Sequence, residues 1–256
     1  MMKQSIDKKI EQERYNERAK KLLGSRIDKS LTGSNSVAIS HRSPYLRYEK
    51  LILENIKDAN SCVLELGAGT GAFTECLLNT GAKVLATDIS EASLEILQKR
   101  FAKYKNISVK AADLEFLPFD DNTFDFVTSA GSLSYGDNML VLNEIYRVLK
   151  PNGMYIAVDS LNHNPVYMLN RWIHYLRGRR TLSTLKRMPT TNLIDIYRKQ
   201  FGQSSVYYFG SITWIVPFFK IFLSEKKISM TIDYFDKIVN VKKSAFKFVM
   251  CVKKVN

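Results

Sequence analysis

The stretch "VLELGAGTG", residues 63–71, most constrains the fold of this chain. An apolar run ends beside Glu65, and Gly67, Gly69 and Gly71 then follow at alternate positions. Glycine lacks a Cβ and tolerates positive φ, so such a turn after a buried strand brings main chain close to a ligand. A nicotinamide or flavin dinucleotide is one such ligand, because the spacing also satisfies the loose dinucleotide fingerprint. A plain strand-to-helix turn is the alternative without a ligand.

Strands and helices are predicted to alternate around this turn. Apolar strands are expected at 62–66, 82–88, 107–113, 123–130 and 154–159, with helices at 72–79, after Ser90, and over 138–149. Such alternation implies crossover connections and a parallel sheet covered on both faces. Two later strand-like segments, 204–209 and 245–255, follow helices expected from Asn164 and over 192–201. The sequence therefore predicts an α/β fold.

The flanks of this core are predicted to be helical. Residues 3–23 indicate a polar helix with a thin apolar stripe, formed by Tyr15, Ala19, Leu22 and Leu23. We therefore divide the chain into an N-terminal helical arm or lid, 1–59, and a main domain, 60–256. Within that domain, 160–200 and 211–244 are expected to be elaborations on the side of the substrate.

Composition places the chain among globular proteins. Hydrophobic residues make up 45% and charged residues 25% of 256. The longest apolar run, 212–219, is too short to span a bilayer and contains Pro217. The N-terminus has no apolar core typical of a secretory signal. Three cysteines without C-x-x-C spacing disfavour a disulfide framework or a zinc site, and we predict a cytoplasmic protein without a metal.

The net charge of +13 is unevenly distributed. Residues 61–160 contain 8 Lys or Arg against 13 Asp or Glu, whereas 161–200 contain 8 against 1 and 201–256 contain 9 against 3. This asymmetry suggests a core that binds a cationic or hydroxyl-rich cofactor, and a flank that meets an anionic partner.

Three carboxylates stand at the ends of the first three predicted strands. Asp88 ends the second strand, where either a dinucleotide or a methyl donor presents ribose hydroxyls. Glu65 and Asp113 fit only the methyl donor. Such a donor carries a cationic sulfonium, which suits the negative charge of Glu65, and an exocyclic amine, which can donate to Asp113. The same acidic cradle would repel a pyrophosphate.

The motifs "VLELGAGTG", "VLATDIS", "AADLEFLPFDDNTFDFVTS" and "EIYRVLKPNG" resemble, in this order, the class I S-adenosylmethionine-dependent methyltransferases. The ubiquinone/menaquinone-type group is the most similar, over roughly residues 60–160. The resemblance implies a Rossmann-like seven-stranded sheet with helices on both faces and the last strand antiparallel. The helical pattern that begins at Asn164 separately predicts a helical insertion after the fifth strand.

The resemblance also implies residue roles toward S-adenosylmethionine. Its methionine part would lie against the glycine turn and the end of the fourth strand, and its ribose and adenine against the ends of the second and third strands. The residues concerned are Glu65, Gly67, Ala68, Gly69, Gly71, Asp88, Ile89, Asp113, Leu114 and Ser129.

The methyl acceptor is predicted from the segment that follows the fifth strand. Residues 159–190 are rich in arginine, and Arg177, Arg179 and Arg180 indicate an anionic acceptor. A weaker resemblance, carried by "LNHNP" and "LRGRRT", is to methyltransferases of bacterial surface-polysaccharide clusters. We therefore expect O-methylation of a phosphorylated, nucleotide-linked or lipid-linked saccharide. A solvated basic face is the alternative.

Candidate catalytic residues lie near the end of the fifth strand. His163 is the first candidate for the base, and Asp159 is an alternative base or its orienting partner. His41, Arg42 and Tyr45, in the N-terminal arm, are expected to help cover the site.

Rival functions remain open at this point. A nucleic-acid methyltransferase would also be basic, but no RNA-binding module is visible and we predict no nucleic-acid partner. A lipid-quinone methyltransferase would use 212–223 as a membrane-facing lid, with peripheral membrane contact. A non-catalytic cofactor-binding scaffold is the alternative of another class. The oligomeric state does not follow from the sequence.

Overall fold

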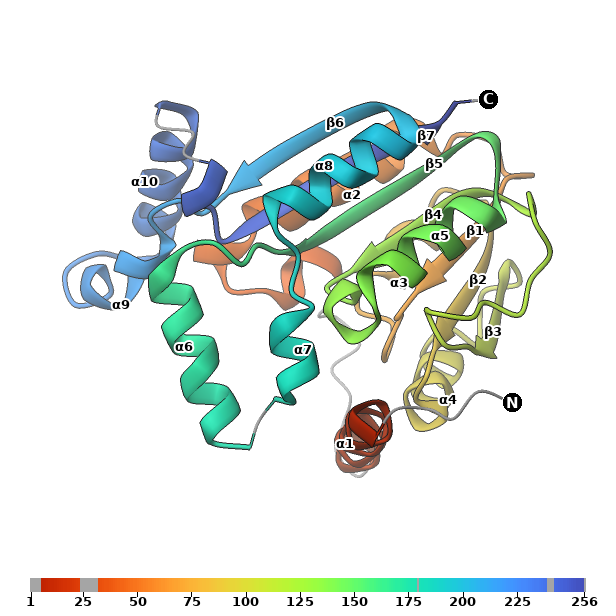
Figure 1. Cartoon of the computed structure of the whole chain (residues 1–256), viewed down its shortest axis with the longest axis horizontal. Helices are drawn as coiled ribbons and strands as arrows, with labels where there is room; N and C mark the ends of the chain where they lie inside the picture. The colour runs from red at the N-terminus through yellow and green to blue at the C-terminus, as the bar shows by residue number, and fades with distance from the viewer. Residues whose placement is uncertain (1–5, 24–31, 179, 239–241, 256) are drawn as a thin grey trace.

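The computed structural model describes residues 6–23, 32–178, 180–238 and 242–255. Its centre is a seven-stranded sheet in the order β3-β2-β1-β4-β5-β7-β6 (Figure 1). The strands are β1 (Cys62–Leu66), β2 (Lys83–Asp88), β3 (Ile107–Ala111), β4 (Phe124–Ala130), β5 (Leu149–Ser160), β6 (Gly202–Phe209) and β7 (Lys247–Lys254).

The pairing follows the predicted class. β1 pairs in parallel with β2 and β4, and the same direction continues to β3 and β5. β7 lies between β5 and β6 and runs antiparallel to both of them. The carboxyl ends of β1, β2, β3 and β4 therefore meet at one edge of the sheet, where ligands bind in such folds.

Helices cover both faces. On one face α5 (Asn138–Val148) and α8 (Thr191–Phe201) bury apolar side chains against the strands. On the other face α2 (Ser43–Asn55), α3 (Thr74–Leu78) and α4 (Glu91–Arg100) do the same. Two apolar cores thus sandwich the sheet, and the predicted α/β fold with helices on both faces is confirmed.

Local sequence signals explain where several helices begin. The Ser90 hydroxyl accepts from the Ser93 N–H at 3.1 Å and caps α4. Asn164 caps α6 (Pro165–Leu176) by accepting from the Val166 N–H at 3.0 Å. Both residues are at the predicted helix starts, because short polar side chains satisfy N–H groups that lack a partner within the helix.

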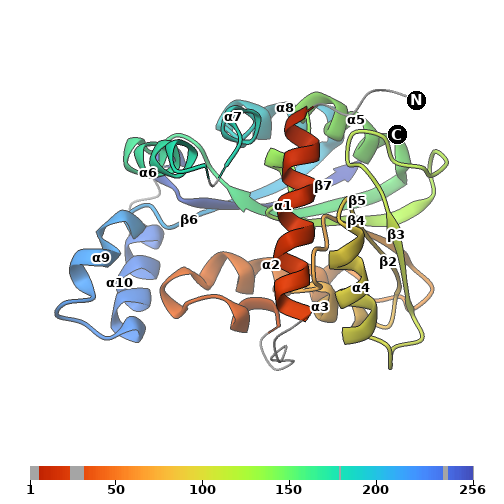
Figure 2. The same cartoon turned by 90° about the horizontal axis from the view of Figure 1, so that it is seen from below.

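The later part of the chain contains further helices that the sequence patterns did not predict individually. They are α7 (Leu182–Lys186), α9 (Val216–Phe219) and α10 (Glu225–Ile238). Figures 1 and 2 both place α6, α9 and α10 at the end of the molecule away from β3. Within the described part of the chain, no helix combines the length and apolarity needed to cross a membrane.

Helix α1 (Ile6–Leu23) lies outside these two layers. Seen from below, it crosses in front of the sheet (Figure 2). Its Gln12 amide donates to the Ile89 carbonyl at 2.8 Å, just beyond β2, and Lys8 pairs with Asp113, just beyond β3. The helix therefore lies over the carboxyl ends of the strands.

Candidate active site

A cavity of about 360 Å³ lies between α1 and the carboxyl edge of the sheet. Its floor is formed by the glycine turn after β1 together with the chain just beyond β2, β3 and β4. Its roof is formed by one face of α1. The cavity is lined by eight of the ten residues predicted to hold the cofactor: Glu65, Gly67, Ala68, Gly69, Asp88, Ile89, Asp113 and Leu114.

The glycine turn is shaped by its hydrogen bonds to Asp88. The Gly69 N–H donates to Asp88 Oδ2 at 2.9 Å, and the Ser90 N–H donates to Oδ1 at 2.8 Å. Gly69 has a φ of +55°, and a Cβ placed on it would meet no atom within 4 Å. The turn therefore presents bare backbone to open space, and the carboxylate beside it keeps lone pairs for a ligand's hydroxyls.

Glu65 supplies a buried carboxyl group beneath the turn. Its Oε2 accepts from the Thr74 hydroxyl at 2.7 Å, and the residue is 3% exposed. Burial raises the pKa of the Glu65 carboxyl to about 7. A cationic ligand in the cavity would compensate for this cost of desolvation.

This titration has a measurable consequence. A carboxyl with a raised pKa holds its proton more tightly in the folded chain, so the free energy of unfolding of the ligand-free protein should fall as pH rises from about 5 to about 8. For a rise from 4.5 to about 7, the loss is up to about 3 kcal/mol. Urea unfolding at both pH values should show a smaller pH dependence in Glu65→Gln, whose amide oxygen can still accept from Thr74. Equal slopes for the two proteins would refute the raised pKa.

Asp113 is already engaged by the roof. Lys8 donates to both of its carboxylate oxygens, at 2.8 and 2.6 Å, and also pairs with Glu115. The carboxylate predicted to meet the adenine amine therefore also fastens α1 to the sheet edge. A ligand that used Asp113 would have to share it with Lys8.

Two predicted cofactor residues do not line the cavity. Gly71 has a φ of +84°, and a Cβ there would lie 2.5 Å from the Phe101 ring, so this glycine is required by packing against α4. The Ser129 hydroxyl is 2.7 Å from the Tyr155 hydroxyl and points into the apolar core. Its neighbours Ala130 and Gly131 reach the cavity instead.

Neither candidate base reaches the cavity lining. The Nε2 atom of His163 accepts from the Thr191 N–H at 2.8 Å, so its ring is tied to the start of α8. Asp159 is buried and accepts from the Leu133 N–H at 3.0 Å. Burial raises the pKa of Asp159. This carboxylate anchors η3 (Leu133–Tyr135), which places Tyr135 in the cavity.

The predicted acceptor residues also lie elsewhere. Arg177 is exposed, Arg180 is half-buried outside the lining, and Arg179 lies outside the described residues. The His41 ring packs on Phe246, and Arg42 donates to the Val37 carbonyl. Tyr45 stacks on Phe73 with ring centroids 5.0 Å apart, and Phe73 does line the cavity.

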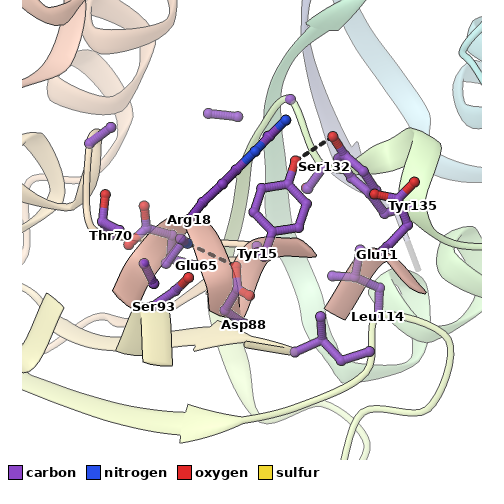
Figure 3. A pocket seen from close by; sticks show the side chains of 18 of the residues that line it. Glu11, Tyr15, Arg18, Glu65, Thr70, Asp88, Ser93, Leu114, Ser132 and Tyr135 are labelled. Atoms are coloured by element: carbon purple, nitrogen blue, oxygen red, sulfur yellow. Dashed lines mark hydrogen bonds between the residues drawn. The ribbon is translucent and has the colours of Figure 1, made fainter. Parts of the chain in front are cut away.

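No residue of α1 is among the site residues predicted from the sequence. Glu11, Tyr15, Arg18, Ala19 and Leu22 project from α1 into the lining. Figure 3 shows the hydroxyl of Tyr15 reaching that of Tyr135, with which it forms a hydrogen bond. The signal was present, because Tyr15, Ala19 and Leu22 form the thin apolar stripe noted on this helix. An apolar stripe on an otherwise polar helix is typical of a helix that packs against another part of the protein. Here the stripe faces the cavity.

Residues 64–157 match the model of the methyltransferase domain family. Residues 64–157 carry a methyltransferase domain. The family predicted from the four motifs is thereby confirmed, and S-adenosylmethionine is the methyl donor of that family. Among the described residues, no group of three His, Cys, Asp or Glu side chains could hold a metal ion.

Curated relatives are similar over the same region. A demethylmenaquinone methyltransferase of Clavibacter sepedonicus is 38% identical over 118 residues, which cover 44% of this chain and 46% of that protein. A sterol 4-C-methyltransferase of Caenorhabditis elegans is 35% identical over 105 residues, covering 40% and 31%. The match thus spans less than half the length of each relative.

Solved structures extend the similarity of fold beyond this region. A geranyl diphosphate methyltransferase in complex with GPP and sinefungin superposes with a TM-score of 0.58 at 15% identity. The superposition covers 84% of this chain and 80% of that one. The seven-stranded methyltransferase sheet is therefore confirmed across most of the chain.

Proposed function

We propose that the chain transfers a methyl group from S-adenosylmethionine to a small molecule bound beneath α1. The observation that carries this proposal is the meeting of the Gly69 turn, Glu65 and Asp88 in one cavity of about 360 Å³. S-adenosylmethionine supplies an electrophilic methyl group on a positively charged sulfur. Glu65 and Asp88 offer the negative charge that suits its ammonium and its ribose hydroxyls, so the residues fit this cofactor.

The roof supports a proposal for the class of acceptor. Beside the cofactor residues, the lining includes the rings of Tyr15 and Tyr135 and the apolar side chains of Ala19 and Leu22, together with the charged side chains of Lys8, Glu11 and Arg18. Burial raises the pKa of Tyr15, as does the neighbouring Tyr135 hydroxyl, so Tyr15 stays protonated and can donate hydrogen bonds. An acceptor with an apolar body fits these residues, consistent with the quinone and sterol named for the relatives.

Glu11 adds a polar requirement to this acceptor. The residue is 6% exposed, and its Oε1 accepts from the hydroxyls of Thr181 and Thr184, both at 2.9 Å. Its Oε2 is buried and has no hydrogen-bond partner among the described residues. A buried carboxylate oxygen without a partner is costly, so a hydroxyl or amine of the acceptor would stabilise it. Figure 3 shows Glu11 on the Tyr135 side of the cavity, across from Glu65 and Asp88.

The predicted anionic saccharide stays a second candidate. The basic excess of residues 161–200 favours it, and Arg18 is a cation of the lining. Arg177 and Arg180, however, do not line the cavity. The proposed function is tested by calorimetry with S-adenosylhomocysteine, followed by product formation with a reduced naphthoquinone, a sterol and a nucleoside diphosphate sugar. Failure to bind S-adenosylhomocysteine would end the proposal, whereas the preferred compound decides the acceptor class.

Glu11→Gln is expected to slow turnover of the acceptor. Its amide oxygen can keep the two threonine bonds, but the amide nitrogen that replaces Oε2 is a donor and can no longer accept from the substrate. We expect a loss of about 10- to 100-fold in kcat/KM for the acceptor, the value of a hydrogen bond to a charged group. S-adenosylhomocysteine affinity should change little.

Glu13→Gln is the matched control, because Glu13 is exposed on the same helix and loses the same charge. Equal kinetics in the Glu11 and Glu13 variants would remove Glu11 from the acceptor site. A loss of S-adenosylhomocysteine affinity in Glu11→Gln would instead assign Glu11 to the cofactor.

A further inference from the structure

Large apolar side chains are exposed at the end of the molecule formed by α6, α9 and α10. On α6, Leu169, Trp172 and Leu176 follow helical spacing, and Leu176 is 77% exposed. In α9 and the turn after it, Phe218, Ile221 and Phe222 are 65%, 72% and 83% exposed. We call these six residues the terminal apolar surface. Figures 1 and 2 both show α6 and α9 at this end.

The terminal apolar surface is not needed by the small core beneath it. That core consists of Val216, Ile228 and Ile232, with Phe219 and Leu223 packed against them. Phe218, Ile221 and Phe222 alternate with these inward-facing residues and point away from the core. Phe218, Ile221 and Phe222 lie within five residues of one another, and large exposed apolar side chains grouped in this way mark a surface that meets a partner or a membrane.

Positive charge accompanies these residues. Lys220, Lys226 and Lys227 are exposed around the turn, and exposed Arg177 follows Leu176 at the end of α6. Lys220 pairs with Glu225 at 3.0 Å. Residues 201–256 contain 9 Lys against 3 Asp or Glu, so the surroundings keep a basic excess. An anionic surface is therefore the complementary partner.

Self-association fits these charges poorly. Two copies joined through this surface would bring the same lysines toward one another, and like charges disfavour such a contact. An anionic bilayer instead accommodates both features at once. Its headgroups attract lysine and arginine, while tryptophan and phenylalanine enter the interface without spanning it.

We propose that the terminal apolar surface docks on an anionic phospholipid membrane. Phe218, Ile221 and Phe222 enter the interfacial region, and the neighbouring lysines face the lipid phosphates. This mode agrees with the finding that no described helix could cross a membrane. The inference is independent of which acceptor the cavity binds.

The test is co-sedimentation of the full chain with vesicles of phosphatidylcholine, with and without phosphatidylglycerol. The wild-type protein should bind the anionic vesicles, and more weakly as salt rises. Phe218→Ser combined with Phe222→Ser should weaken binding by at least about tenfold, because the variant lacks the two phenylalanine rings that would be buried in the membrane on binding. Lys226→Glu with Lys227→Glu should weaken binding to anionic vesicles.

Leu46→Ser with Leu53→Ser is the matched control, since both leucines are about half exposed on α2, at 51% and 54%. This variant should bind like the wild type. Calorimetry with S-adenosylhomocysteine establishes that each variant is folded. The inference is overturned if the wild type does not sediment with anionic vesicles, or if the phenylalanine variant sediments equally. It is also overturned if ultracentrifugation shows that the wild type and the leucine variant are dimers and that the phenylalanine variant is a monomer. A second copy of the chain would then cover the surface.

Discussion

Gly69→Val is expected to abolish binding of the methyl donor. Gly69 has a φ of +55°, and its missing side chain points into the open space of the cavity. A branched side chain there would occupy the volume proposed for the methionine part of the donor. We expect calorimetry with S-adenosylhomocysteine to show an affinity reduced by more than about 100-fold, because a steric clash cannot be relieved by rigid backbone.

Gly178→Val separates this effect from backbone strain. Gly178 has a similar φ of +66°, and a Cβ there also meets no atom within 4 Å, but it lies outside the cavity lining. Both variants should lose about 1–2 kcal/mol of stability, the cost of a left-handed conformation in a residue with a Cβ. Only Gly69→Val should lose the donor. Retained affinity in Gly69→Val would mean that the donor does not approach this turn.

Asp88→Ala is the second large effect that we expect. The carboxylate holds the Gly69 N–H and is the predicted partner of the ribose hydroxyls, so its removal disturbs the turn and leaves those hydroxyls unpaired. We expect S-adenosylhomocysteine affinity to fall by about 10- to 100-fold, from hydrogen bonds worth about 1.5–3 kcal/mol.

Asp125→Ala controls for the loss of a loop anchor. Asp125 also accepts from a backbone N–H, that of Cys62 at 2.8 Å, but at the opposite end of β1. This variant should lose stability and keep its affinity for the donor. If the two aspartate variants bind S-adenosylhomocysteine equally well, Asp88 is a structural residue and the ribose assignment is wrong.

The floor of the cavity could be predicted because its signals are local. A strand, a glycine turn and a carboxylate at the end of the next strand lie within about 25 residues, and parallel strands bring such ends to one edge. Eight cofactor candidates accordingly line one cavity. Gly71 and Ser129 failed to reach it because a single turn or strand residue can face either the ligand or the core, and the motif does not say which.

The roof could not be placed in the same way. Its contacts join α1 to Asp113, Tyr135 and Thr181, all more than a hundred residues away in sequence. No periodicity encodes such pairings. His163 shows the converse case, because nearness to a strand end predicts a catalytic role, whereas the structure places its ring outside the cavity lining, where it accepts a hydrogen bond from the start of α8. The stripe on α1 was visible in the sequence, but its target was not.

The way α1 is fastened has a consequence for the order of events in a catalytic cycle. The helix is held at Asp113 and at Ile89, beside the proposed donor site, and through Glu11 at Thr181 and Thr184 on the other side. One rigid element thus spans both halves of the cavity, so a ligand that tightens the helix against one half preorganises the other. Because such a coupling is reciprocal, we expect each substrate to raise the affinity of the protein for the other. We also expect the spent donor and the methylated product to leave through a shared movement of α1.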